Sequence, residues 1–128
     1  MSYHFSKTTS LGFDDAVARA TEVLKSHGFG VLTEIDVKET LKKKINADFR
    51  RYKILGACNP AFAHKALQAE PRIGLMLPCN VVVQELDSGD VEVSAIDPIA
   101  SMAAVQNPAL GEIAGEVRGM LVRVIEEI

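Results

Sequence analysis

The stretch VVVQELDSGDVEVSAI, Val81 to Ile96, decides the fold class of this chain. Valines dominate its first half, and apolar residues alternate with polar ones in its second half, as in two β-strands. The segment DSGD between the two halves is rich in residues that favour a tight turn. The stretch therefore predicts an antiparallel hairpin in which Val81–Leu86 pairs with Val91–Ile96.

Further strands and helices are expected on both sides of this hairpin. Strand patterns cover residues 3–7, 29–35 and 50–57, and RIGLMLP at 72–78 is an apolar run that Pro78 interrupts before the next strand. Helical patterns cover residues 12–28, 36–46, 60–70, 98–105 and 108–128. The last three helices begin with Asn59-Pro60, Asp97-Pro98 and Asn107-Pro108, in which the first residue caps the helix and Pro suits its first position.

The last helical segment, residues 108–128, has the clearest buried face. Its apolar residues follow three- and four-residue spacing: Leu110, Ile113, Val117, Leu121, Val124 and Ile128. No linker, repeat or low-complexity tract divides the chain. We therefore predict one α+β domain over residues 1–128, with a mostly antiparallel sheet and helices packed on one face.

Composition excludes several classes of protein. The chain has 128 residues, 48% of them hydrophobic and 24% charged, which is the balance of a globular domain. Its net charge of −3 argues against a nucleic-acid partner bound through phosphate neutralisation. No apolar run is long enough for a membrane span, and the first ten residues lack the apolar region of a secretory signal. We expect a cytoplasmic protein with no membrane partner, in which both cysteines are free thiols.

Both cysteines stand in the same context, directly before an asparagine. They lie in ILGACNPAFAHKAL, residues 54–67, and in LMLPCNVVV, residues 75–83. Cys58 directly precedes a helix start, where the helix dipole stabilises a thiolate, although a small buried residue at a strand end is the alternative reading. Cys79 follows Pro78, which indicates a bulge or an edge position.

We predict that these two segments converge on one small polar pocket. Its candidate binding residues are Cys58, Asn59, Cys79 and Asn80. Hydrogen-bond donors at a helix N-terminus would favour an anionic or thiol-bearing ligand, with Cys58 as the more reactive thiol. The two cysteine Cα atoms should then lie within about 10 Å of each other. In the alternative reading, Asn59 only caps its helix and Asn80 only satisfies backbone groups.

A metal site and a catalytic site are weaker readings of the same residues. Cys58 and Cys79 with one of His64, His4 and His27 would supply three ligands, with zinc or Cu(I) as the metal. Zinc sites, however, usually show closely spaced pairs of ligands, which this chain lacks. We therefore expect no metal, no cofactor and no catalytic residue.

Three glycines recur every four residues in the last helix. Gly111, Gly115 and Gly119 lie on the face opposite the apolar stripe. Together they cost a helix roughly 2–3 kcal/mol relative to alanine, so close approach by another element or by a partner subunit would explain them. The stripe contributes to our expectation of a homodimer.

The cysteine segments also resemble a known family. GACNPAFAHKAL followed by IGLMLPCNVVVQE is similar to the domain-of-unknown-function family 302, and the order of elements agrees over nearly the whole chain. The most specific positions are Gly56, Cys58, Asn59, Pro60, Ala63, Leu67, Leu77, Pro78, Cys79, Asn80 and Val83. The resemblance implies a TBP-like fold with a curved antiparallel sheet, often in dimers, and it implies no activity.

Three functions from different classes remain open at this point. The first is a small-molecule binding module, a homodimer, with its pocket at the two Cys-Asn segments. The second is a thiol-dependent redox protein or enzyme that uses Cys58, with Cys79 as the resolving thiol. The third is a structural or interaction domain.

Overall fold

Five strands form one sheet in the computed structural model, which describes residues 2–128. Along the sheet the order is β1-β5-β4-β3-β2, and every neighbouring pair is antiparallel. The strands are β1 (His4–Thr9), β2 (Gly30–Asp36), β3 (Tyr52–Cys58), β4 (Cys79–Glu85) and β5 (Val91–Ile96). The predicted α+β class and antiparallel sheet are confirmed.

The hairpin of β4 and β5 lies near the middle of this sheet, as the sequence predicts. Val83 pairs with Val93, and Gly89 adopts a positive φ of 90° in the turn between the strands. Successive side chains on a strand point to opposite faces of the sheet, and the side chains on one face of the hairpin are fully buried. The buried side chains are Val81, Val83, Val91 and Val93.

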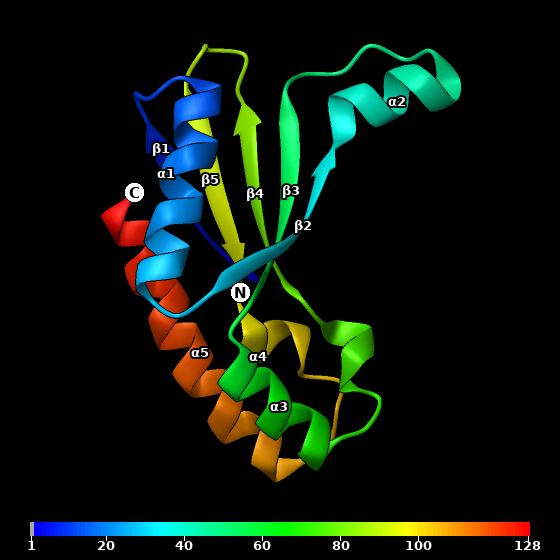
Figure 1. Ribbon diagram of the computed structural model, residues 1–128, viewed down its shortest axis with the longest axis vertical. Coiled ribbons are helices and arrows are strands. Elements are labelled where there is room, and N and C mark those ends of the chain that lie inside the picture. Colours follow the sequence, from blue (N-terminus) through cyan, green and yellow to red (C-terminus); the bar gives the residue numbers. More distant parts are fainter. Residues whose placement is uncertain (1) are drawn as a thin grey trace.

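Helices α1 (Phe13–Ser26) and α5 (Pro108–Glu127) cover that buried face. Figure 1 shows both lying along the sheet on the same side. Their inward residues join the strands in the main core, in which Leu24, Leu121 and Val124 are completely buried. The predicted apolar stripe of α5 is therefore the surface that packs on the sheet.

A second, smaller core lies beyond one end of the sheet. It is built by α3 (Pro60–Ala69), the 3-10 turn η1 (Ile73–Met76), α4 (Pro98–Ser101) and the first half of α5 (Figure 1). Its buried residues are Ala66, Ile73, Met102, Leu110 and Ala114. The seam between the two cores falls where β3 ends and β4 begins.

This end of the molecule differs from the sequence patterns in two details. Within the apolar run at 72–78, Ile73–Met76 forms the 3-10 turn η1, and Leu75 in it is 83% exposed. The pairing of β3 with β4 ends at Ala57 and Cys79, so the residues before Pro78 have no strand beside them. The helix expected over 98–105 ends at Ser101.

Helix α2 (Val37–Ile45) forms as predicted but packs differently from the other long helices. The Asp36 carboxylate accepts a 2.9 Å hydrogen bond from the Glu39 N–H, and Asn46 ends the helix in the left-handed region. None of its residues is buried, and Figure 1 shows α2 projecting away from the sheet. The helix and β2 together form an arm at the edge of the molecule.

Thr33 of β2 and Pro78, the residue before β4, lie close to the backbone of β3 at Gly56. A Cβ atom at this position would overlap Thr33 Oγ1 and lie 2.9 Å from Pro78 Cγ. The register of β2 against β3 shifts between Val31 and Thr33, which brings Thr33 opposite Gly56. Only a residue without a side chain fits between these neighbours.

Candidate functional site

A cavity lies at the seam between the two cores, next to both cysteines. It is bounded by the ends of β3 and β4 and by α3, α4 and α5, and its volume is about 30 Å³. A space of this size holds about one or two water molecules. The lining residues are Ala57, Cys58, Asn59, Phe62, Ala63, Ala66, Leu77, Pro78, Cys79, Pro98, Met102, Ile113, Ala114 and Val117.

The structure brings three of the four candidate residues to this cavity. Cys58, Asn59 and Cys79 line it, and Asn80 does not. The pairing of β4 with β3 is regular from Cys79 onward, so no bulge turns the Asn80 side chain inward. Cys79 is buried beneath the helices, whereas Asn80 is exposed and lines a hollow on the uncovered face of the sheet.

The two cysteines are close together because their strands are paired. Cys79 lies directly opposite Ala57, the residue before Cys58. Paired Cα atoms on antiparallel strands are at most about 5.5 Å apart and consecutive ones about 3.8 Å, so the cysteine Cα atoms lie within about 9 Å. Both thiols are free, as expected.

The two thiols differ in burial. Cys79 is 7% exposed, and Cys58 is only partly buried. Burial, and to a smaller extent the negative charge of an ionised Cys58, raises the pKa of the Cys79 thiol to about 11. Cys79 is therefore protonated at neutral pH, and Cys58 is the more accessible sulfur.

Asn59 fills the capping role that its Asn-Pro context predicts. Its side-chain oxygen accepts a 3.4 Å hydrogen bond from the Phe62 N–H at the first turn of α3. Its amide nitrogen lies next to Gly28, whose backbone has a positive φ of 86°. The side chain thus joins the start of α3 to the loop after α1, and its oxygen is already engaged.

The lining also contains features that the sequence analysis missed. Met102 lies at the end of α4, is 8% exposed, and brings a third sulfur to the wall of the cavity. Most other lining residues are apolar, so the cavity is less polar than predicted. The Asp97-Pro98 helix start fixes where α4 begins, but no motif near Met102 indicates that it lines the same cavity as the cysteines.

The three histidines lie elsewhere. His64 is exposed on α3, His4 bonds Ser6 on the uncovered sheet face, and His27 Nε2 lies 2.6 Å from a Glu127 carboxylate oxygen. Within residues 2–128, no three His, Cys, Asp or Glu side chains are grouped so that they would hold a metal ion. Histidine therefore does not supply a third ligand beside the cysteines.

The comparisons with known proteins place the chain in a family. Residues 5–128 match the family described as "Domain of unknown function DUF302". The chain belongs to the DUF302 family. A crystal structure of an uncharacterized conserved DUF302 protein from Bacillus stearothermophilus is 31% identical, with a TM-score of 0.92, over 99% of this chain and 98% of the other. No curated protein matches the chain.

Membership of the DUF302 family confirms the resemblance and brings no activity with it. The function must therefore be argued from the residues of this chain. In the part of the chain that the structure describes, no helix combines the length and apolar composition needed to cross a bilayer.

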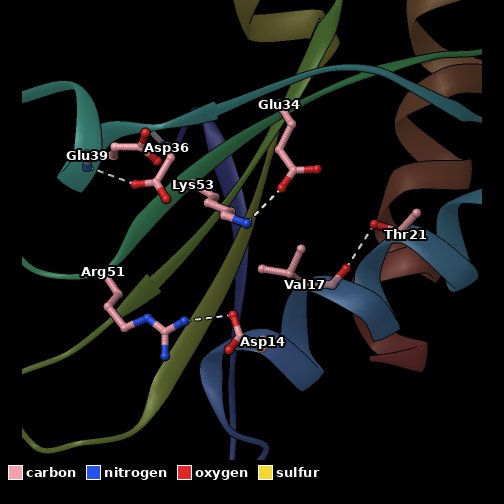
Figure 2. Close-up of polar contacts among 8 residues, drawn as sticks. All are labelled: Asp14, Val17, Thr21, Glu34, Asp36, Glu39, Arg51 and Lys53. Atoms are coloured by element: carbon pink, nitrogen blue, oxygen red, sulfur yellow. Dashed lines mark hydrogen bonds and ion pairs between the residues drawn. The ribbon is translucent and has the colours of Figure 1, made fainter.

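A second polar cluster lies between α1 and the arm, on the helix side of the sheet. Figure 2 shows Arg51 reaching the Asp14 carboxylate and Lys53 reaching Glu34, at 2.6 and 2.8 Å. Arg51 lowers the pKa of Asp14, first by its hydrogen bond and then by its charge. Arg51 thus joins the start of β3 to α1, and Lys53 joins β3 to β2. The cations and carboxylates pair with one another, which leaves the cavity as the stronger candidate site.

Proposed function

We propose that this DUF302 protein is a small-ligand binding module whose site is the cavity at the seam. The ligand is of the thiol type: a compact sulfur-bearing group enters the cavity, and the rest of the ligand remains outside. The observation that carries the proposal is that both free thiols line one atom-sized space with a third sulfur in its wall.

The lining favours a thiol-type ligand over an anionic one. Asn59 is the one amide side chain of the cavity wall, and its oxygen already accepts a bond from the backbone of α3. Moving an anion from water into such apolar surroundings without new hydrogen bonds is strongly unfavourable. A neutral sulfur group loses little hydration there and contacts polarizable atoms.

Burial of Cys79 argues against the redox-enzyme alternative. A resolving cysteine must attack as a thiolate, and a thiol with a pKa of about 11 is ionised in only about one molecule in 10⁴ at pH 7. Cys58 would have to act without an efficient resolving partner. Reversible binding of a ligand does not require Cys79 to ionise.

Labelling with methyl methanethiosulfonate tests the proposal. The Cys58 thiolate attacks the sulfenyl sulfur, a disulfide to a methylthio group forms, and methanesulfinate leaves. We expect Cys58 to be labelled in the folded protein at least tenfold faster than Cys79, since the raised pKa alone lowers the thiolate population of Cys79 about 100-fold.

Cys58→Ser and Cys79→Ser assign the two rates by mass spectrometry. A protein in which Cys58 reacts only after unfolding would remove the proposed function, because both cysteines would then be packing residues. Retained circular dichroism of each variant shows that the comparison concerns folded protein.

We also propose that the protein is a cytoplasmic homodimer. The helices cover one face of the sheet, and the other face carries a row of apolar side chains that runs from β4 to the edge strand β2: Val82, Ile54 and the 47% exposed Ile35. A second copy packed on this face would shelter them from water. A reducing compartment would keep the two thiols free.

Sedimentation velocity at micromolar concentration tests the dimer. We expect a dimer that Val82→Lys dissociates, because a charge would be buried at the contact. Gly115→Leu should leave it intact, since the glycine stripe of α5 lies on another surface. A wild-type monomer would overturn the proposal, as would a dimer broken by Gly115→Leu and not by Val82→Lys.

A further inference from the structure

Three sulfur-bearing side chains line the cavity, and they come from three separate parts of the chain. Cys58 ends β3, Cys79 begins β4, and Met102 follows α4. Thiolates and a thioether are soft ligands, which select soft metal ions such as Cu(I) over hard cations. Carboxylates and imidazoles, which would favour other metals, are absent from the lining.

We propose that the cavity binds one soft monovalent metal ion, Cu(I), with Cys58 and Cys79 as its thiolate ligands and Met102 as its thioether ligand. The inference rests on the proposed function, since it assigns a specific sulfur-seeking ligand to the same cavity. It also departs from the sequence analysis, which expected no metal and which considered a metal site only as an alternative with histidine as the third ligand.

The geometry of the strands supports the pair of thiolates. The register holds the two cysteine Cα atoms within about 9 Å of each other, at the end of the paired strands where both residues line the cavity. The strand pairing fixes this spacing before any ligand arrives, which lowers the entropy lost on binding.

The size of the cavity supports an ion over a larger ligand. A volume of about 30 Å³ takes a single ion without displacement of the surrounding side chains, whereas an organic molecule enters only in part. The apolar wall, including Phe62, Leu77 and Val117, would keep water and oxygen-bearing ligands away from the metal.

Burial of Cys79 is compatible with this role. A bound metal takes the place of the thiol proton, and each cysteine that coordinates releases its proton to solvent. No electron is transferred, because the ion arrives and remains as Cu(I). Two thiolates, one thioether and no fourth ligand do not complete the tetrahedral set that structural zinc requires.

Competition with a chromophoric Cu(I) chelator under anaerobic, reducing conditions tests the proposal on the full chain. We expect one Cu(I) per chain in the wild type, and loss of this binding in Cys58→Ser and in Cys79→Ala. Met102→Leu keeps the volume of the side chain and removes its sulfur, so it should weaken binding about tenfold or more while the fold is kept.

Two controls use the rest of the molecule. His64→Ala removes an exposed histidine outside the cavity and should leave Cu(I) affinity unchanged. Ag(I), which does not change oxidation state in air, should bind with the same stoichiometry and should protect Cys58 from methyl methanethiosulfonate. Zn(II) at the same concentration should not.

Two results would overturn the three-sulfur site: binding no tighter than in Cys58→Ser, or a Met102→Leu variant with wild-type affinity. Failure of this inference differs from failure of the proposed function. If Cys58 is labelled rapidly in the folded protein and Cu(I) is not bound, the cavity still captures sulfur groups and only the metal is wrong. If Cys58 is unreactive until the protein unfolds, both are wrong.

Discussion

Helices α2 and α5 begin with the same kind of cap, but they differ in how much of each helix is buried. Each begins with a side-chain oxygen that accepts a backbone N–H, from Glu39 to Asp36 and from Ala109 to Asn107. Helix α5 then buries six residues against the sheet and the small core, and α2 buries none. Lys7 and Arg19 also donate hydrogen bonds to the last carbonyls of α5, at Glu126 and Glu127.

The difference shows that local signals determine where a helix forms and not what it packs against. Capping and apolar spacing are present in both segments, but three apolar residues on a nine-residue helix offer little area to bury. The stability of α5 therefore comes from tertiary packing, and that of α2 from its cap and its exposed ion pairs. The following substitutions measure this contrast.

The largest expected effect is truncation of the α5 stripe. Leu121→Ala should lower the free energy of unfolding by about 2–5 kcal/mol, because Leu121 is completely buried and its removal leaves a cavity. Leu41→Ala on α2 is the matched control and should cost less than about 1 kcal/mol. Urea denaturation gives both values. Equal losses would mean that α2 is buried in the assembled protein.

The next largest effect should be a difference between the two helix caps in the stability lost when each is removed. Asn107→Ala removes the cap of α5 and also a 2.8 Å hydrogen bond from its amide to the Ala69 carbonyl of α3, for a loss of about 2 kcal/mol. Asp36→Ala removes a cap and the charge near Lys53 but no second hydrogen bond, and it should cost about 1 kcal/mol or less. Denaturation midpoints compare the two. A larger loss at Asp36 would contradict the view that α2 is stabilised by its cap and exposed ion pairs and adds little packing to the fold.

A smaller effect of opposite sign is expected on the exposed face of α5. A Cβ atom at Gly115 meets no atom of the chain within 4 Å, so Gly115→Ala should raise the free energy of unfolding by about 0.5–1 kcal/mol through helix propensity alone. Thermal unfolding at several protein concentrations measures this. A destabilised variant would indicate that another surface packs against the glycine stripe.

The smallest effect should appear at high pH in α2. A hydrogen bond with Glu39, and then the charge of Glu39, raises the pKa of Lys43 above its ordinary value of 10.5. The raised pKa stabilises the fold fully below pH 10.5, and this stabilisation is lost as pH rises through the raised value. The difference in urea midpoint between wild type and Glu39→Gln should therefore be small at pH 8 and vanish above the raised pKa. A difference that persists there would not come from this pair.

Much of the fold could be predicted because its signals are local. The hairpin, the caps at Asp36, Asn59 and Asn107, and the stripe of α5 each depend on residues a few positions apart. The turn at 73–76 and the free-standing α2 could not be predicted in the same way. Their conformations depend on whether a strand or helix packs beside them, and residues a few positions away do not determine this.

The candidate site could be predicted only in part for a related reason. The Cys-Asn contexts led to Cys58, Asn59 and Cys79 because the register of β3 and β4 brings them together. Asn80 was expected in the pocket, with Pro78 taken as a sign of a bulge or an edge position, but the observed strand is regular there and Asn80 does not line the cavity. Met102 carries no local motif, and only the packing of the small core brings it to the cavity.

The close approach of Thr33 and Pro78 to Gly56 limits how this sequence can change over time. A side chain at position 56 becomes possible only if Thr33 is first replaced by a smaller residue, and even then Pro78 remains close. Substitutions at 33, 56 and 78 should therefore be inherited as a group among related chains. Pro78 directly precedes Cys79. Substitutions in this part of the sheet would therefore be restrained by a residue that also positions the Cys79 thiol.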